Sequence, residues 1–407
     1  MWLEKELVST MLGVSEASLS TFTVEDTFNP GNTLQGYIST SRTKMYGALC
    51  ILRVNGEDVD PQVVYATPKI KYPFVSLADG RRKFSWPDSV GADFYEKYDG
   101  TNVLAYSYSD VNGDRYLTYK TRLTPVMRAN RFGDFVSMWK DILEASTAEK
   151  EEPILSLNEL GYLVKTGQYA FAFEMIGKKN PHLINYGVDL DAYLLFGVRQ
   201  RDGAIIPPSK INEDGGGLAC QIAAVMETAS EGDDLTVLYD HARQNMASSL
   251  TKVDDTDDES QFFGSEGRIV YLHQGDGTAL MFKCKPPQIE AIHWTSDSIP
   301  VPLVMEAIWK HYESCDDEPT VDDMVDHLLE DFPLRAINKS MPRIKKALVT
   351  VAERLAFRDK VSSTYNGCGL TFEEHGRGPV MREMSNHFDR KSMSNVFNAL
   401  RELGYVE

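Results

Sequence analysis

Two patterns of hydrophobic and polar positions divide the chain. From residue 37 to about residue 292, apolar and polar residues mostly alternate with a period of two, interrupted by Gly, Asn and Asp at turns. After Ile299 and Pro300 the apolar residues instead recur at the three- and four-residue spacing of helices. Because proline disfavours helical backbone at the residue before it, we place a domain boundary near Pro300.

These patterns predict the α+β class: a first domain, residues 1–299, of antiparallel sheets with flanking helices, followed by a mainly α-helical domain, residues 300–407. Within the first domain, helical spacing interrupts the strands at residues 131–146 and 217–230. In the second domain, we expect helices at residues 304–312, 321–329, 344–355 and 396–403.

The composition is that of a folded protein, and its charge is unevenly distributed. The net charge of −18 argues against a protein that coats nucleic acid by charge alone, since phosphate neutralisation needs clustered Lys and Arg. Acidic residues gather at 254–259 and 315–331, however, whereas basic residues recur along 335–360. A basic face that meets phosphates can therefore exist in the second domain, with a solvated helix face as the alternative.

Other features bear on location and stabilisation. No apolar run has the length that a bilayer requires, and the start lacks a secretory signal pattern, so we expect a cytoplasmic protein without a membrane partner. The five cysteines are scattered and form no CxxC pair, so neither a disulfide framework nor a zinc site is indicated.

The first segment with candidate chemistry is Glu96-Lys97-Tyr98-Asp99-Gly100-Thr101-Asn102, followed by an apolar run and Asn112-Gly113. Because Asn-Gly suits the positive φ angles of a tight turn, we expect a loop that leads into a β-hairpin. A lysine there can attack an α-phosphate once its amine has lost its proton. A Lys-x-Asp-Gly string also arises by chance in about one chain in ten of this length, and a surface turn is then the simpler interpretation.

The second segment is the alternating run 169–177. Its aromatic residues share one face of the expected strand, and Glu174 stands on the other face with two alanines. Small neighbours leave room for a ligand, so this carboxylate can accept a hydrogen bond from a ribose hydroxyl or bind a metal-bound water. A glutamate that faces solvent is the alternative.

The third segment is a predicted second hairpin that begins near Glu266-Gly267 and returns through Lys283 and Lys285. The two lysines are two positions apart and therefore lie on one face of the return strand. Like charges that project together repel unless an anion lies between them, and a triphosphate is a natural candidate. A solvated lysine pair is the alternative.

Taken in order, these segments resemble the covalent nucleotidyltransferases, which include ATP-dependent DNA and RNA ligases and mRNA capping enzymes. Within that superfamily the chain is most similar to the phage-type single-stranded RNA ligases. That similarity rests on Tyr119-Lys120-Thr121-Arg122, on the string from Asn180 to Tyr186, and on the strand 194–199. The resemblance covers about residues 37–285, and it allows a phage origin.

The resemblance implies that Lys97 is the catalytic residue, which becomes covalently joined to AMP. It also implies that Glu174 and Glu266 serve a metal, magnesium or alternatively manganese. The nucleotide-binding residues that it implies are Lys71, Glu96, Lys97, Asp99, Gly100, Arg122, Glu174, Glu266, Lys283 and Lys285. One departure stands out: before Gly47 the family usually carries an Arg that contacts the triphosphate, whereas this chain has Tyr46, with Arg42 and Lys44 nearby.

The function implied is an ATP-dependent polynucleotide ligase that acts as a monomer and joins 5′-phosphate to 3′-hydroxyl ends, with RNA favoured over DNA. A DNA ligase or a capping guanylyltransferase would use the same residues, although no oligonucleotide-binding barrel is recognisable after Lys285. An inactive nucleotidyltransferase fold that binds nucleic acid through its helical domain is the alternative of another class. Residues 381–403 have the proportions of a helix-turn-helix unit, although many helix pairs without a DNA role look the same.

Overall fold

The computed structural model describes residues 2–41, 43–76, 82–130, 133–145, 164, 166–180, 182, 184–214, 221–252, 262–286, 299, 301–314, 318–329, 332 and 334–406. It divides into two compact units, which are described separately below. The first comprises Met1–Ser296 with Trp309–Asp317, and the second comprises Asp297–Ile308 with Glu318–Glu407.

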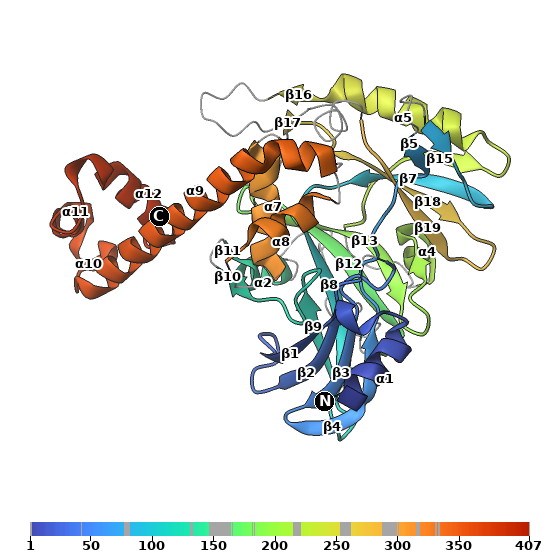
Figure 1. The fold of residues 1–407 in the computed structure, drawn as a ribbon, viewed down its shortest axis with the longest axis horizontal. Helices are drawn as coiled ribbons and strands as arrows, with labels where there is room; N and C mark the ends of the chain where they lie inside the picture. Colours follow the sequence, from blue (N-terminus) through green and yellow to red (C-terminus); the bar gives the residue numbers. More distant parts are fainter. Residues whose placement is uncertain are drawn as a thin grey trace. The chain divides into compact units, whose positions relative to one another are not determined.

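A nine-stranded sheet forms the centre of the first unit, and all its strand pairs are antiparallel (Figure 1). In spatial order its strands are β15 (Val225–Ser230), β7 (Gly91–Lys97), β18 (Gly267–His273), β19 (Ala279–Cys284), β14 (Ile205–Ile206), β13 (Asp191–Arg199), β12 (Tyr169–Ile176), β8 (Thr101–Ser109) and β9 (Arg115–Lys120). The predicted antiparallel sheet is confirmed. Because β7 lies between β15 and β18, segments more than a hundred residues apart become neighbours.

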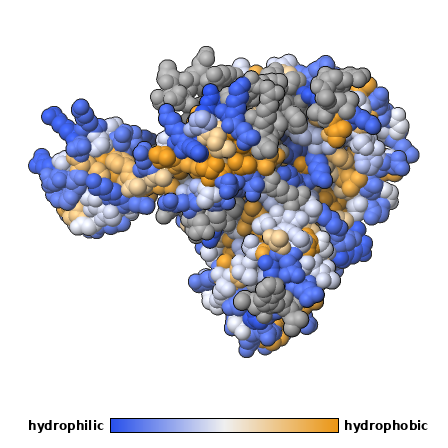
Figure 2. All heavy atoms as spheres, in the orientation of Figure 1, coloured by the Kyte–Doolittle hydropathy of each residue, from blue (hydrophilic) through white to orange (hydrophobic). Residues whose placement is uncertain are grey.

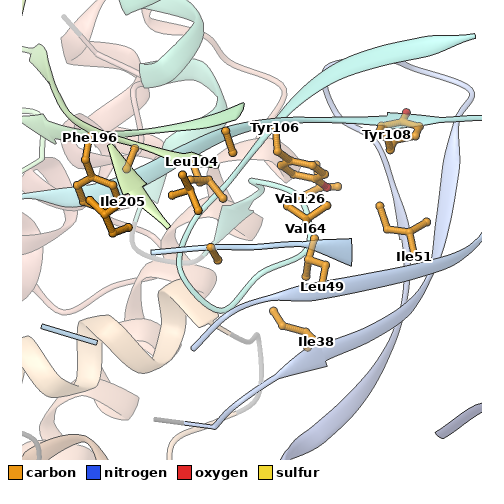
Figure 3. Packing of buried hydrophobic residues seen from close by; sticks show 14 of the residues in the cluster. Ile38, Leu49, Ile51, Val64, Leu104, Tyr106, Tyr108, Val126, Phe196 and Ile205 are labelled. Atoms are coloured by element: carbon orange, nitrogen blue, oxygen red, sulfur yellow. The ribbon is translucent and has the colours of Figure 1, made fainter. Parts of the chain in front are cut away.

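A second sheet of four strands packs against the first through a shared apolar core. Its strands are β1 (Leu19–Glu25), β2 (Thr33–Ser39), β3 (Leu49–Val54) and β4 (Glu57–Val64). Figure 3 shows Ile38, Leu49 and Val64 of this sheet facing Leu104 and Tyr106 of β8. The alternation of apolar residues read from the sequence therefore fills the space between two sheets.

Short hairpins and helices complete the first unit. The hairpins pair β5 (Phe74–Ser76) with β6 (Arg82–Phe84), β10 (Ala129–Asn130) with β11 (Gly133–Asp134), and β16 (Thr251–Lys252) with β17 (Phe262–Phe263). The helical segments are α1 (Trp2–Leu12), η1 (Glu16–Ser18), α2 (Phe135–Ala145), α4 (Pro208–Asp214) and α5 (Leu235–Ser249). No described helix is both long and apolar enough to cross a membrane.

The two predicted helical interruptions have different outcomes. Helix α2 confirms the first, since Phe135, Met138, Trp139 and Ile142 recur at helical spacing and are buried. The second, at 217–230, is wrong where it is described, because residues 225–230 form strand β15. An alanine-rich sequence favours a helix in isolation, but here its backbone pairs with the open edge of β7.

The described elements of the second unit are helices, and the unit contains the first part of α7 (Val301–Ser314). Its other elements are α8 (Val321–Leu328), α9 (Leu334–Gly367), α10 (Phe372–His375), α11 (Arg377–Met384), η2 (Arg390–Ser392) and α12 (Met393–Glu402). Val361, Val380, Met384, Val396 and Leu400 form a core where the end of α9 meets α11 and α12. Lys339, Lys345, Lys346 and Lys360 occupy exposed positions of α9. Figure 2 shows hydrophilic residues across much of the visible face.

Candidate functional site

The pairing of β7 with β18 brings two of the predicted segments together. Lys97 is the last residue of β7, and its register partner on β18 is Gly267, the neighbour of Glu266. Alternation along β7 separates the side chains: Tyr95 packs in the core between the two sheets, whereas Ala92 and Phe94 pack in a different core on the other face. Lys97 therefore shares a face with Tyr95.

Glu266 lies between two lysines. One of its carboxylate oxygens accepts a hydrogen bond from Lys97 Nζ, and the other lies 3.0 Å from Lys285 Nζ. Glu266 is 6% exposed and Lys285 4%. Burial alone would raise the pKa of Glu266, but the ammonium groups of Lys285 and Lys97 outweigh it and hold the pKa below its usual range. Three predicted site residues from two of the segments thus form one charged cluster.

Lys283 and Lys71 meet through their backbones. The N–H of Lys283 donates to the carbonyl of Lys71 at 2.9 Å, which joins the segment after β4 to β19. The Lys283 ammonium lies 5.9 Å from the ring centroid of Tyr72, in the range of a cation–π contact. On β19, Met281 packs toward the core between the sheets and Phe282 toward the opposite one, so Lys283 and Lys285 share the Lys97 face, as the spacing predicts.

Glu174, on β12, is partly buried and lies close to positive charge. Burial raises its pKa to about 7, although the charges of Lys97, Arg122 and His182 oppose that rise. Asn102, the register partner of Glu174 on β8, donates an amide hydrogen bond to its carboxylate at 3.4 Å. Pairing of β12 with β8 therefore places this carboxylate within electrostatic reach of Lys97.

Asp99 and Gly100 shape the loop after Lys97. The Asp99 carboxylate accepts a hydrogen bond from the backbone N–H of Ile184 at 3.0 Å, and the Asp99 N–H donates to the hydroxyl of Tyr186 at 2.7 Å. The carboxylate thus holds the segment before β13. A Cβ on Gly100 would lie 2.2 Å from the carbonyl oxygen of Met175, so close approach of two chains requires glycine there.

Glu96 is the predicted binding residue whose hydrogen bonds lie outside the Lys97–Glu266–Lys285 cluster. Burial raises its pKa, on which the charges of Glu266 and Lys97 also act. It alternates with Lys97 and so projects from the opposite face of β7. There its carboxylate accepts hydrogen bonds from the hydroxyl of Ser265 and from Arg268 Nη1, the latter at 2.6 Å. Ser265 and Arg268 were not singled out in the sequence. The Glu96 side chain joins the two strands behind the cluster, and we do not assign it to ligand binding.

Arg122 lies close to Tyr46, the position at which the covalent nucleotidyltransferases usually carry an arginine. The Arg122 guanidinium carbon lies 5.7 Å from the Tyr46 ring centroid. Its Nε is buried and has no hydrogen-bond partner among the described residues. A buried donor without a partner suits an anion. Of the two other basic residues near Tyr46, Lys44 is exposed and Arg42 lies outside the described residues.

Lys120, at the end of β9, supports the segment that carries Arg122. Its side chain is fully buried, and its ammonium donates to the carbonyls of Thr121 and Arg122 at 2.8 and 2.9 Å. Burial, assisted by the charge of Arg122, lowers its pKa to about 7. The lysine therefore holds the backbone that carries Arg122. Nothing in its sequence context distinguishes it from a lysine at a strand end.

Of the two predicted metal ligands, Glu174 is better suited to a divalent cation than Glu266. Both oxygens of Glu266 are engaged by ammonium groups, which leaves its carboxylate poorly suited to a divalent cation. Glu174 offers one carboxylate, and no group of three His, Cys, Asp or Glu side chains that could hold a metal is present among the described residues. Magnesium commonly takes one or two carboxylates together with substrate phosphates and waters, so Glu174 fits that pattern whereas Glu266 does not.

Comparison with solved structures finds similar folds at low identity. Two structures of an archaeal ATP-dependent RNA ligase, forms 1 and 2, both match with TM-scores of 0.46, at 15% and 13% identity. The matches cover 84% and 98% of this chain and 81% and 98% of the ligase chains. A protein from Aquifex aeolicus, described provisionally as an ATP-dependent DNA ligase, matches with a TM-score of 0.44 at 11% identity, over 94% of this chain and 88% of its own.

No family model and no curated protein matches the sequence. Similarity at the level of these structures carries no conclusion about activity, so a function for this chain must be argued from its own residues.

Proposed function

We propose that this protein is an ATP-dependent polynucleotide ligase with Lys97 as its nucleophile. The observation that carries the proposal is the contact of partly exposed Lys97 with buried Glu266, which also pairs with buried Lys285. Glu174 lies close enough for its pKa to respond to Lys97. These residues come from strands far apart in the sequence, whose order matches that of the covalent nucleotidyltransferases.

The proposed reaction has three group transfers. First, Lys97 Nζ, having lost a proton, attacks the α-phosphorus of ATP; a P–N bond forms, and the P–O bond to pyrophosphate breaks. Next, an oxygen of a 5′-phosphate displaces the lysine from AMP, and Lys97 recovers its proton. Finally, a 3′-hydroxyl loses its proton and attacks the activated 5′-phosphate, so AMP leaves and the strand is sealed. Each step is an in-line displacement that depends chiefly on positioning and charge stabilisation.

The neighbouring residues take roles consistent with their contacts. Glu266 holds the Lys97 amine with one oxygen and Lys285 with the other. When the nucleotide binds, its α-phosphate competes with Glu266 for the two ammonium groups. Lys283 adds positive charge on the same face, and its backbone N–H joins it to the Lys71 segment. Arg122, with its buried unpaired Nε, replaces the family arginine at Tyr46 as a phosphate contact.

Glu174 is proposed to accept a ribose hydroxyl or to bind a divalent cation with the substrate phosphates. When bound, magnesium would neutralise phosphate charge and help to align the displacements. Manganese would serve in the same way. The ionised carboxylate is the competent form in either role, which links ligand binding to the pKa of about 7.

RNA is the proposed polynucleotide, with the second unit providing contacts to it. Exposed lysines on α9 can meet successive phosphates. A DNA ligase or a capping guanylyltransferase is the second candidate, because Lys97, Glu266 and Lys285 would serve these enzymes equally well.

The proposal is tested by incubation with α-labelled ATP or GTP and magnesium, followed by a denaturing gel. We expect acid-labile label on the protein from ATP and none in Lys97→Ala. Absence of label in the wild type, or label that persists in Lys97→Ala, would contradict the mechanism. Label from GTP alone would favour the capping reaction.

Sealing assays with 5′-phosphorylated RNA and DNA strands then identify the polynucleotide. We expect faster sealing of RNA, and faster joining of nicked duplex DNA would refute that preference.

A further inference from the structure

Helix α5 lies against the strand that carries Lys283 and Lys285, and none of its residues belongs to the motifs above. Two of its side chains, one helical turn apart, donate hydrogen bonds to the backbone carbonyls of these two lysines. The Tyr239 hydroxyl lies 2.9 Å from the Lys283 oxygen, and Arg243 Nε lies 2.9 Å from the Lys285 oxygen. Tyr239 is fully buried and Arg243 is 6% exposed.

These contacts occur where β19 ends. Its ladder with β18 reaches only Cys284, whose partner is Arg268. Lys285 lies beyond this pair, and its buried carbonyl needs a donor from elsewhere. Lys283 is held from both sides, since its N–H donates to Lys71 and its carbonyl accepts from Tyr239. A continuous set of hydrogen bonds thus links α5 to the backbones of three candidate phosphate-binding lysines.

The Tyr239 hydroxyl is fixed in place by its ring. Its centroid lies 5.3 Å from that of Phe84, 5.9 Å from that of Trp86 and 6.1 Å from that of Phe74, all in edge-to-face arrangements. Phe74 and Phe84 belong to the hairpin that follows Lys71 along the chain, and Phe282 of β19 contacts Trp86. The ring cluster therefore joins the Lys71 segment, β19 and α5.

We infer that Tyr239 and Arg243 are positioning residues for nucleotide binding. They hold the end of β19 so that Lys283 and Lys285 present their ammonium groups on the Lys97 face. This inference rests on the proposed function, because it assigns the lysines to a phosphate. A displacement of about 1 Å at a reacting group can lower a rate on the order of a hundredfold, so a loosened strand end has a kinetic consequence.

The test compares two Tyr→Phe variants. Tyr239→Phe keeps the ring cluster and removes the hydroxyl that donates to the Lys283 carbonyl. Tyr271→Phe is the matched control, since this buried hydroxyl also donates to a backbone carbonyl at 2.9 Å, that of Leu195. Both variants should lower the melting temperature to a similar extent. Only Tyr239→Phe should raise the ATP concentration for half-maximal adduct formation, by a factor on the order of ten, the equivalent of one hydrogen bond.

Arg243→Met removes the donor to Lys285 and should have the same effect on ATP dependence, whereas Arg243→Lys, which restores a donor, should recover part of it. If the wild type forms the adduct and neither Tyr239→Phe nor Arg243→Met changes the ATP dependence beyond that of Tyr271→Phe, the inference is wrong.

A second measurement does not depend on ligase activity. Limited acylation with an amine-reactive reagent, read by mass spectrometry, reports the accessibility of individual lysines in the folded protein. We expect faster modification of Lys283 and Lys285 in Tyr239→Phe and Arg243→Met than in the wild type or Tyr271→Phe. If the wild type forms no adduct and the variants are nevertheless modified faster, the positioning is supported and the proposed function is overturned. Unchanged modification in both variants would overturn the positioning.

Discussion

The Glu266→Gln substitution tests whether the charged cluster is organised as described. Glutamine retains the volume of the side chain but removes its negative charge. One amide oxygen can still accept from a lysine, while the NH₂ group then faces the other ammonium. Lys97 is 21% exposed in its side chain and can turn toward water, whereas Lys285 is only 5% exposed and cannot do so cheaply.

The magnitude follows from that difference in exposure. Removing one partner of a buried ion pair typically costs about 3–5 kcal/mol, because a charge is left buried without compensation. Lys285 is the more deeply buried of the two lysines and would be left without a counter-ion. We therefore expect Glu266→Gln to lower the free energy of unfolding by about 3–5 kcal/mol at pH 7.5. The pKa of Glu266 is lowered in the folded state relative to its ordinary 4.5. Its contribution is therefore complete above pH 4.5 and declines as the pH falls below it.

Urea denaturation of both proteins at pH 7.5, 5.5 and 4 measures the difference. We expect the gap between wild type and Glu266→Gln to be constant between pH 7.5 and 5.5 and to narrow at pH 4. Glu231→Gln, at an exposed turn, serves as the control and should change stability by less than about 0.5 kcal/mol. A loss at pH 7.5 no larger than that of the control, or a gap that widens toward pH 4, would refute the description of Glu266 as a buried anion between two cations.

Two further predictions concern pH. Because the pKa of Glu174 is raised to about 7, the magnesium-dependent affinity for a non-hydrolysable ATP analogue should increase as the pH rises through 7, and Glu174→Gln should remove this dependence in a calorimetric titration. Because the pKa of Lys120 is lowered from 10.5 to about 7, the unfolded chain binds more protons between these values, and wild-type stability gains from this group as the pH rises. Lys120→Met should lack that gain in urea denaturation at pH 7 and 9.5, and an identical pH slope in both proteins would count against a buried, weakly basic Lys120.

The sequence predicts the orientation of those site residues whose spacing along a strand determines the face on which they lie. Lys283 and Lys285 lie two apart on a strand, so their common face follows from the pleat alone. Glu174 stands between apolar neighbours in the same way. The same rule applied to Glu96 and Lys97 assigns them to opposite faces, and the structure agrees: Glu96 binds Ser265 and Arg268, away from Lys97. Proximity in sequence to the proposed nucleophile is thus weaker evidence for a place in the site than the face of the strand.

The predictions that failed depend on pairing partners that spacing does not reveal. A helix was predicted at residues 225–230 because the sequence of one segment indicates only its local propensity. The interaction that determines its structure is pairing with the edge of β7. The hairpin expected at Asn112-Gly113 is confirmed. Of these two residues only Gly113 has a positive φ, and the Asp110 carboxylate accepts hydrogen bonds from the N–H groups of Asn112 and Asp114.

Tyr239 and Arg243 belong to a different class of residue, for which a sequence offers no signal. Their contribution lies in hydrogen bonds to backbone carbonyls, and every residue has a carbonyl, so the type of the accepting residue says nothing about the donor. What makes these two bonds specific is where the β18–β19 ladder ends, one residue before Lys285. A strand that supplies a charged group just past its last paired residue needs donors from another element. Nucleotide-binding lysines at strand ends should therefore be examined together with the helix that packs over them.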